Sequence, residues 1–165
     1  MKLPARAVAL CIIALLGFAA PTAQAASPTS GKLTRSKRSV TWSGGPFVLS
    51  EPNYAGSACI AGRVDPTCDH FMLTVNMPEG SHVQVKVATA RPEPSNGITG
   101  DGDDYDLYVY SPDGGLMGIA ETPGGNERLT FRHRATYNGK AYEVRVGPWF
   151  VYPGSTYKGT ATLID

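Results

Sequence analysis

Alternation of apolar and polar side chains is the main pattern in this chain. The clearest case lies between residues 81 and 90, where Val83, Val85 and Val87 point one way and Lys86 points the other. Successive side chains of a strand point to opposite faces, so this repeat of two predicts a half-buried strand. By the same rule we expect further strands at residues 39–42, 46–49, 69–76, 105–110, 116–121, 128–134, 142–146 and 156–164.

Turn residues separate these stretches at intervals of about ten residues. Pro112-Asp113-Gly114-Gly115 and Asn138-Gly139 are the strongest of these turn signals, and the longest loop is expected at residues 91–102. Proline fixes φ and glycine accepts the left-handed region, so both favour turns over strands. Eight or nine short strands without helical periodicity predict an all-β domain, either a single antiparallel β-sandwich or a barrel.

The first 25 residues do not fit this pattern. Lys2 and Arg6 precede an almost wholly apolar run at residues 7–20, and Ala23-Gln24-Ala25 follows it. This order is typical of a signal peptide with cleavage after Ala25, which predicts a secreted, extracellular protein. The run is shorter than the roughly 20 apolar residues of a membrane span. An uncleaved anchor is the alternative.

The net charge bears on which classes of partner can be expected. The chain has 15 Lys and Arg and 14 Asp and Glu, and loss of Lys2 and Arg6 with the leader leaves 13 basic residues against 14 acidic ones. A near-neutral protein gives no electrostatic reason to expect nucleic acid or a membrane as partner. We expect a flexible linker at residues 26–38, where a short basic run ends, followed by one monomeric domain at residues 39–165.

Two cysteines remain after leader cleavage, Cys59 and Cys68. An even pair in an exported protein predicts a disulfide, and closing so short a loop stabilises a domain by about 2.5–3 kcal/mol. A metal pair is the alternative, but the sequence has no second Cys/His pair at zinc spacing.

The strongest candidate for site chemistry is an acidic, glycine-broken turn that leads into the strand at residues 105–110. Its carboxylates are Asp101, Asp103, Asp104 and Asp106. Carboxylates at this density repel one another, and Ca²⁺ prefers oxygen ligands of this kind. The spacing is not that of an EF-hand. The alternative is that Asp104 and Asp106 cap turn amides and the other two are solvated.

Aromatic residues form a second candidate. Tyr108 and Tyr110 lie on the strand face opposite Leu107, and Trp149 and Tyr152 fall in an expected loop before the last strand. Such side chains can stack on sugars and bond their hydroxyls. The alternative is that these aromatics pack in the sandwich.

Catalytic residues are not expected. The histidines are His70, His82 and His133, and none of them belongs to a metal-binding pair or accompanies a nucleophile-elbow serine. We therefore expect a protein that is not an enzyme, with a small hydrolase as the remaining alternative.

The segment Asp104-Tyr105-Asp106-Leu107-Tyr108-Val109-Tyr110 with Ser111-Pro112-Asp113-Gly114 resembles the core of bacterial pre-peptidase C-terminal (PPC-like) domains. Residues 139–146 and 157–163 resemble the penultimate and last strands of that family. Residues 41–47 and the cysteine loop resemble a variant found in exported actinobacterial proteins, and the resemblance covers residues 39–163. It implies a jelly-roll-like sandwich of eight or nine strands that accompanies secreted peptidases without catalysing a reaction. No enzyme follows here, so we expect a free-standing role.

These observations predict a secreted binding module for extracellular polysaccharide, matrix or a secreted protein, with Ca²⁺ as a possible stabilising ion. The second hypothesis is an inhibitor or chaperone of a secreted peptidase.

Overall fold

The computed structural model describes residues 26–47, 59, 68–90 and 102–164. In these residues it contains nine strands and one short 3₁₀ helix, η1 (Ala135–Tyr137). The all-β prediction is therefore confirmed. The predicted signal peptide, most of the disulfide loop and residues 48–49 of the strand expected at 46–49 lie outside the described residues. Pro46 and Phe47, the described part of that expected strand, belong to no strand.

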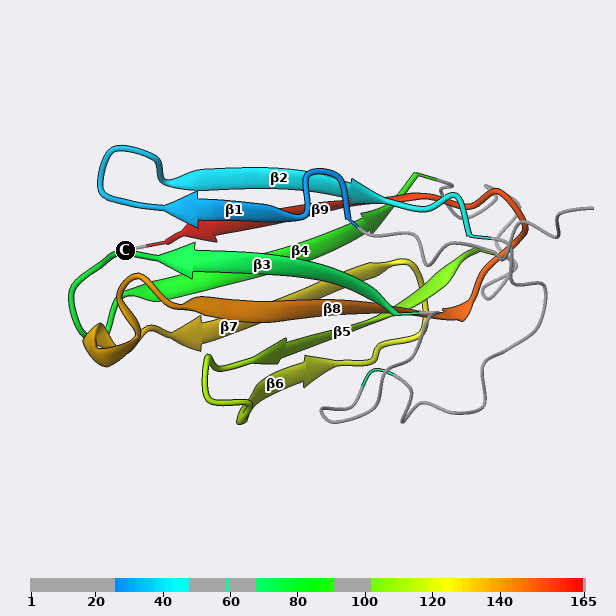
Figure 1. Cartoon of the computed structure of the whole chain (residues 1–165). Helices are drawn as coiled ribbons and strands as arrows, with labels where there is room; N and C mark the ends of the chain where they lie inside the picture. Colours follow the sequence, from blue (N-terminus) through cyan, green and yellow to red (C-terminus); the bar gives the residue numbers. More distant parts are fainter. Residues whose placement is uncertain (1–25, 48–58, 60–67, 91–101, 165) are drawn as a thin grey trace, which may run out of the picture.

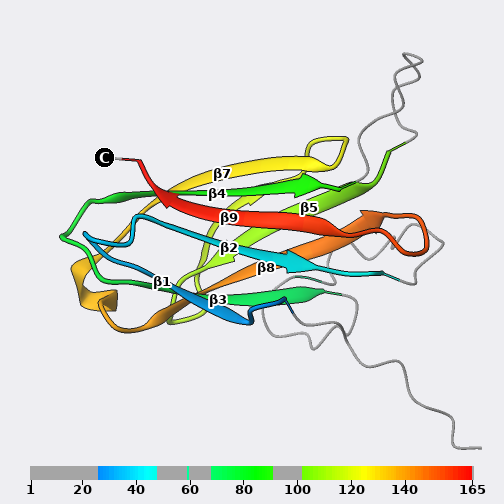
Figure 2. The same cartoon turned by 90° about the horizontal axis from the view of Figure 1, so that it is seen from above.

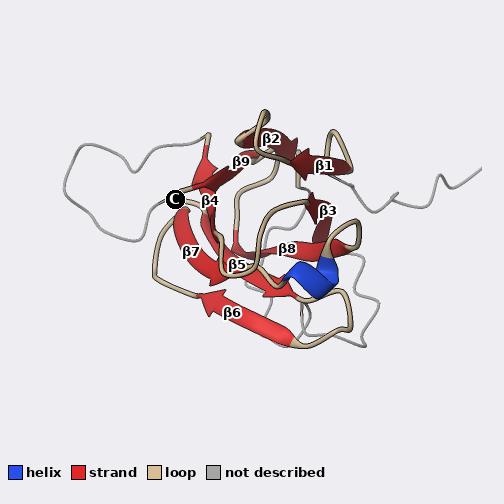
Figure 3. Ribbon diagram, turned by 90° about the vertical axis from the view of Figure 1, so that its left-hand side faces the viewer, coloured by secondary structure: helices blue, strands red, loops and turns tan. Residues whose placement is uncertain are grey.

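The strands form two sheets packed face to face (Figure 1). The five-stranded sheet consists, in spatial order, of β1 (Ser30–Leu33), β3 (Asp69–Val75), β8 (Ala141–Phe150), β5 (Asp104–Tyr110) and β6 (Leu116–Ala120). The four-stranded sheet consists of β2 (Ser39–Gly44), β9 (Tyr157–Leu163), β4 (His82–Thr89) and β7 (Asn126–Arg132). Seen from above and along the strands, the two sheets enclose one interior (Figures 2 and 3).

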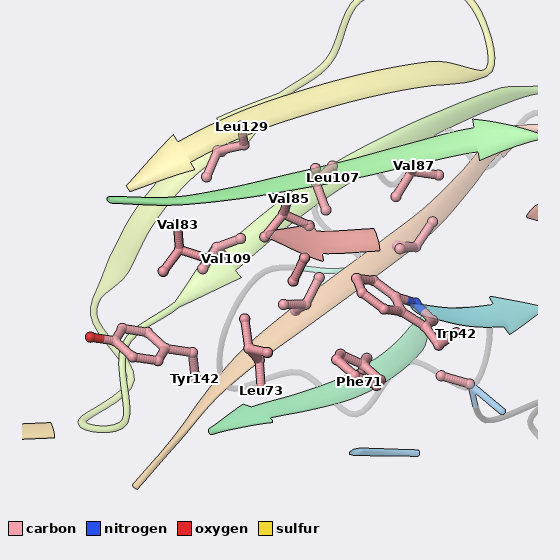
Figure 4. Packing of buried hydrophobic residues seen from close by; sticks show 14 of the residues in the cluster. Trp42, Phe71, Leu73, Val83, Val85, Val87, Leu107, Val109, Leu129 and Tyr142 are labelled. Carbon is pink, nitrogen blue, oxygen red and sulfur yellow. The ribbon is translucent and has the colours of Figure 1, made fainter. Parts of the chain in front are cut away.

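The core lies between the sheets and is built from the predicted inward positions. Val83, Val85 and Val87 of β4 are buried, as are Leu107 and Val109 of β5 (Figure 4). These side chains come from different sheets, so the alternation along each strand supplies a shared apolar interior.

Trp42 of β2 and Phe71 of β3 form the main aromatic contact between the sheets. Their ring centroids lie 4.0 Å apart with an interplanar angle of 7°, and Figure 4 shows the two side chains beside each other. Stacked pairs of this kind stabilise a core by about 0.5–1.5 kcal/mol beyond the area that they bury.

A second, smaller cluster covers the outer face of β5. It contains Tyr108, Tyr110 and the disulfide between Cys59 and Cys68, which confirms the predicted disulfide. Because β5 is covered on both faces, its side chains from Tyr105 onward are all buried.

Residues 26–38, predicted to be a flexible linker, belong to the sandwich. β1 pairs in parallel with β3, and Ala26 and Leu33 are 1% and 0% exposed. Ser27 and Ser43 also exchange two backbone hydrogen bonds of 2.8 and 3.0 Å. The segment has little apolar patterning, but the open edge of the sheet offers partners for its backbone groups. The predicted antiparallel sandwich thus includes one parallel pair.

Two strand ends also differ from the prediction. Gly44, expected in a turn, is the last residue of β2, paired with Tyr157. β8 runs on through Pro148, which was expected to begin a loop. Asp104 pairs with Phe150 and Tyr105 with Pro148, so Trp149 is an extra residue in β8. A bulge accommodates proline in a sheet because the ladder is already interrupted there.

Candidate functional site

A hollow opens at the end of the sandwich where β5 begins and β8 ends. These two strand ends lie on the right in Figure 1. The volume of the hollow is about 470 Å³, and three carboxylates, one proline and one tryptophan line it. The lining residues are Asp104, Asp106, Glu121, Pro123 and Trp149. They come from the start of β5, the segment between β6 and β7, and the bulge of β8, so the sheet pairing brings them together.

The bulge explains how tryptophan comes to line this hollow. In a regular ladder, neighbouring residues alternate between the core and the outer face. Trp149 is the extra residue opposite the start of β5, and it is half-buried. A bulge redirects a side chain in this way, and such irregularities are frequent next to binding sites.

The Tyr108 hydroxyl joins two of the carboxylates. It lies 2.8 Å from Glu121 Oε1 and 3.3 Å from Asp106 Oδ2, and it donates to either. One hydroxyl has a single proton to donate, so the shorter contact to Glu121 is the stronger bond. Asp104 Oδ1 accepts a 3.1 Å hydrogen bond from the backbone N–H of Gly124, which fixes the segment between β6 and β7.

The electrostatics of the hollow are dominated by negative charge. Burial, followed by the nearby charges of Glu121 and Asp104, raises the pKa of Asp106 to about 7, against the hydrogen bond from Tyr108, which lowers it. Burial also raises the pKa of Glu127, which lies close enough to feel the charges of Asp104 and Glu121. Four carboxyl groups therefore share one end of the sandwich, and one of them is partly protonated at neutral pH.

This repulsion leads to a prediction for stability. A carboxyl whose pKa is raised on folding stabilises the native state at low pH, and the advantage is lost as pH rises from about 4 to about 7. Asp106→Asn removes the buried charge and keeps the shape. We expect it to raise the free energy of unfolding at pH 8 by roughly 1–2 kcal/mol and to change it little at pH 4. Urea denaturation at both pH values measures this, and an equal or smaller stability at pH 8 would contradict the repulsion.

The predicted calcium site is not assembled as expected. Asp103 is fully buried and accepts hydrogen bonds from Thr89 Oγ1 at 3.0 Å, from the Tyr152 N–H at 3.1 Å and from the Ser155 hydroxyl. It therefore fixes loops, whereas the alternative interpretation expected it to be solvated, and it does not line the hollow with Asp104 and Asp106. Asp101 lies outside the described residues. Within the described ranges, no group of three or more His, Cys, Asp or Glu side chains is arranged to hold a metal ion.

The predicted aromatic surface divides into buried and accessible parts. Tyr108 and Tyr110 are 1% and 3% exposed, so the prediction that they form a stacking surface is wrong. The Tyr110 hydroxyl donates a 3.0 Å bond to the carbonyl of Cys59, and the Arg145 guanidinium lies 4.8 Å from the Tyr110 ring centroid. Of the other two residues, Trp149 lines the hollow, whereas Tyr152 is half-buried next to Phe150, with ring centroids 5.5 Å apart.

Two histidines have structural partners away from the hollow. His133 is fully buried, with Nδ1 2.9 Å from the Tyr142 hydroxyl and Nε2 3.0 Å from Asn138 Oδ1. His70 pairs with Glu143 at 2.6 Å on the outer face of the five-stranded sheet. Neither lines the hollow, so its chemistry rests on carboxylates and one indole.

Glu121, Pro123 and Glu127 are the residues of this region that the sequence did not single out. Glu121 directly follows β6, and Glu127 lies on the same buried face of β7 as Leu129 and Phe131. Neither position carries a local signal, because their proximity to Asp106 arises only when β5, β6 and β7 meet.

Comparisons with known proteins identify no family. No protein-family model and no curated protein matches the chain. Among solved structures, it is similar to the pre-peptidase C-terminal domain of collagenase from Bacillus anthracis. The two are 12% identical with a TM-score of 0.42, over 81% of this chain and 93% of that chain. This is the kind of domain that the sequence resembles, and no role of any residue here is assigned from it. A search of the described residues finds no helix that is long and apolar enough to span a membrane.

Proposed function

We propose that this chain is a secreted, monomeric, non-catalytic binding module whose hollow receives a basic group of a secreted protein partner, such as a lysine or arginine side chain. The observation that carries the proposal is the accumulation of negative charge around Asp106, whose pKa is raised to about 7. A bound cation would relieve that repulsion and favour the ionised carboxylate. Relief of the repulsion between the carboxylates would therefore contribute to the binding free energy.

Trp149 complements the carboxylates for this class of ligand. It shares the hollow with Asp104 and Glu121. An ammonium or guanidinium group held over an indole ring is stabilised by about 0.5–2 kcal/mol, more when water is excluded. A planar guanidinium can also bond a carboxylate through two parallel N–H groups. Aromatic ring and carboxylate together thus favour a basic side chain over a simple metal ion.

A neutral polysaccharide is the second candidate, and the same tryptophan favours it. An indole can stack on a sugar ring while carboxylates accept hydrogen bonds from its hydroxyls. The two ligand classes differ in their response to charge. A neutral sugar has no charge to pair with Asp106, so its affinity should depend little on pH and salt.

Titration with two probes separates the candidates. Intrinsic tryptophan fluorescence would follow binding of a short arginine-rich peptide and of neutral oligosaccharides at pH 5.5 and pH 8. If the ionised form of Asp106 binds the cation, the affinity for the peptide should rise roughly tenfold or more over this interval. Asp106→Asn should abolish that rise. Trp149→Ala should weaken binding at both pH values, and calorimetry measures this variant because the indole at the hollow is gone and Trp42 is buried in the core.

Glu79→Gln is the matched control. It also removes one negative charge, but from the turn between β3 and β4, at the opposite end of the sandwich (Figure 1). The amide oxygen of the new glutamine side chain can still accept the hydrogen bond that the Ala135 N–H donates to Glu79. This variant should bind as the unaltered protein does. Equal losses in the Glu79 and Asp106 variants would show that only net charge matters and would refute the proposed site.

The other outcomes are equally distinct. Binding of oligosaccharide without dependence on pH would favour the polysaccharide candidate. Release of reducing ends would identify a hydrolase, since a carboxyl with a pKa near 7 beside a second carboxylate also suits a general acid. Saturable inhibition of a co-secreted peptidase would identify that peptidase as the partner. Failure of both probes to bind would refute the assignment of the hollow.

A further inference from the structure

Asp69 is a second buried carboxylate, separate from those that line the hollow. It is the first residue of β3 and points inward with Phe71, and it is 1% exposed. Its Oδ2 accepts a 2.6 Å hydrogen bond from the Tyr157 hydroxyl, whereas Oδ1 is buried without a hydrogen bond of regular geometry. The backbone N–H groups of His70 and Ala26 are near enough to lower the pKa of the carboxyl. No lysine or arginine forms an ion pair with it among the described residues. An unpaired buried carboxylate is costly, so this arrangement calls for a partner.

The N-terminal segment brings the nitrogen of Ala26 to this carboxylate. Ala26 is 1% exposed, and the paired backbone bonds between Ser27 and Ser43 hold the segment against β2. Gly44, the next residue of β2, makes room for the acid, because a Cβ there would lie 2.0 Å from Asp69 Oδ2. The backbone N–H of Ala26 is close enough to act on Asp69 electrostatically.

The titration of Asp69 agrees with this geometry. Burial raises the pKa of the carboxyl. The Tyr157 hydroxyl, the N–H groups of His70 and Ala26, and the His70 ring act in the opposite direction. These donors do not offset the cost of burying the carboxylate, because its pKa remains raised. A full positive charge at the same place would stabilise the ionised carboxylate further.

The sequence predicts that such a charge is produced during export. Cleavage adds one water molecule across the peptide bond between Ala25 and Ala26, leaving a carboxylate on the leader and an amine on Ala26 that takes up a proton. We propose that this new α-ammonium group forms a buried ion pair with Asp69, which locks the N-terminal segment into the sandwich once the leader has been removed. The inference rests on the predicted cleavage position and is independent of the hollow.

The proposal gives leader removal a role in folding. In the precursor, the nitrogen of Ala26 belongs to a peptide bond and carries no charge. It becomes a charged α-amine only when that bond is cut. The mature chain would therefore gain a contact that the precursor lacks, and the fold would become most stable after export. Among the described residues, the titratable groups that act on Asp69 include Tyr157 and the His70 ring, and Tyr105 packs against Tyr157 with ring centroids 5.5 Å apart.

Comparing authentic and extended N-termini tests this proposal. The full chain is expressed with its leader and collected after export, and mass spectrometry identifies the first residue. A second version carries Ser-Gly inserted after Ala25, so the nitrogen of Ala26 remains an amide. We expect the extended protein to melt on the order of 10 °C below the authentic one. Asp69→Asn should lower the melting temperature strongly in the authentic protein and much less in the extended protein.

The chemistry of the α-amine supplies a readout that does not depend on the variant folding. In the authentic protein it should react with an acylating reagent roughly tenfold or more slowly than in urea, because it is buried and paired. Its pKa should lie above the ordinary value of about 7.7–8.0. The stabilisation is then complete below that value and disappears as pH rises through the raised pKa. An α-amine that titrates normally and reacts as in urea, a different first residue, or equal effects of Asp69→Asn in both versions would overturn the proposal.

Discussion

Replacing Asp103 with alanine is expected to lower the free energy of unfolding by about 3–5 kcal/mol, one of the largest effects in this protein. The carboxylate is 0% exposed and accepts hydrogen bonds from three donors on two separate segments. Thr89 lies at the end of β4, while Tyr152 and Ser155 lie between β8 and β9. Alanine would remove the buried acceptor that two hydroxyls and one backbone N–H share, and losing a buried hydrogen-bond acceptor costs about 1–3 kcal/mol for a donor that water cannot reach.

Urea denaturation of Asp103→Ala and Asp103→Asn measures this effect. The asparagine variant keeps one acceptor oxygen and should be destabilised less than the alanine variant. Asp113→Ala is the control, because Asp113 also accepts bonds from two side chains, Ser111 and Tyr137, but is exposed at the turn between β5 and β6. Solvent can replace the lost acceptor there, so the loss should be much smaller. An Asp103→Ala variant as stable as the control would show that the buried carboxylate does not hold the loops.

The strands could be predicted because their information is local. Val83, Val85 and Val87 alternate within one segment, and their burial follows from that alternation alone. The same reasoning failed for Tyr108. Its strand has one face toward the core, but the cluster with Cys59 and Cys68 buries the other face as well. Alternation tells which side chains share a face, and it cannot tell what another segment places over that face.

The candidate site was predictable only in part for the same reason. Asp104, Asp106 and Trp149 were named from the sequence and do line one hollow. Asp103 and Asp104 are neighbours in sequence, yet one fixes buried loops and the other lines the hollow, because consecutive residues at the start of a strand point in opposite directions. Glu121 joins the site through a partner strand, and only pairing in space reveals that.

The N-terminal segment shows a third limit. Residues 26–38 are polar enough to predict a linker, but Leu33 and Ala26 are almost fully buried. A strand at a sheet edge is held by backbone hydrogen bonds, which have no residue-specific pattern. Composition therefore underestimates order wherever an open edge is available.

Gly159→Ala is expected to destabilise the protein by about 3–5 kcal/mol, through overpacking. Gly159 of β9 lies opposite Trp42 of β2 and is also paired with Val87 of β4. A Cβ at this position would lie 2.0 Å from Trp42 Cε2 and 2.3 Å from Cζ2. Two flanking strands hold the backbone, and the indole is stacked on Phe71, so neither side can move without loss of packing.

A double-mutant cycle tests whether the clash with the indole is the cause. Trp42→Leu alone should also be destabilising, because it empties part of the core. In that background Gly159→Ala should cost at least about 2 kcal/mol less than in the unaltered protein, since the added methyl group then has space. Lys158→Ala, the exposed neighbour in β9, serves as the control and should change stability by no more than about 0.5 kcal/mol. Equal costs of Gly159→Ala in both backgrounds would mean that the glycine is required for its backbone and not for the tryptophan above it.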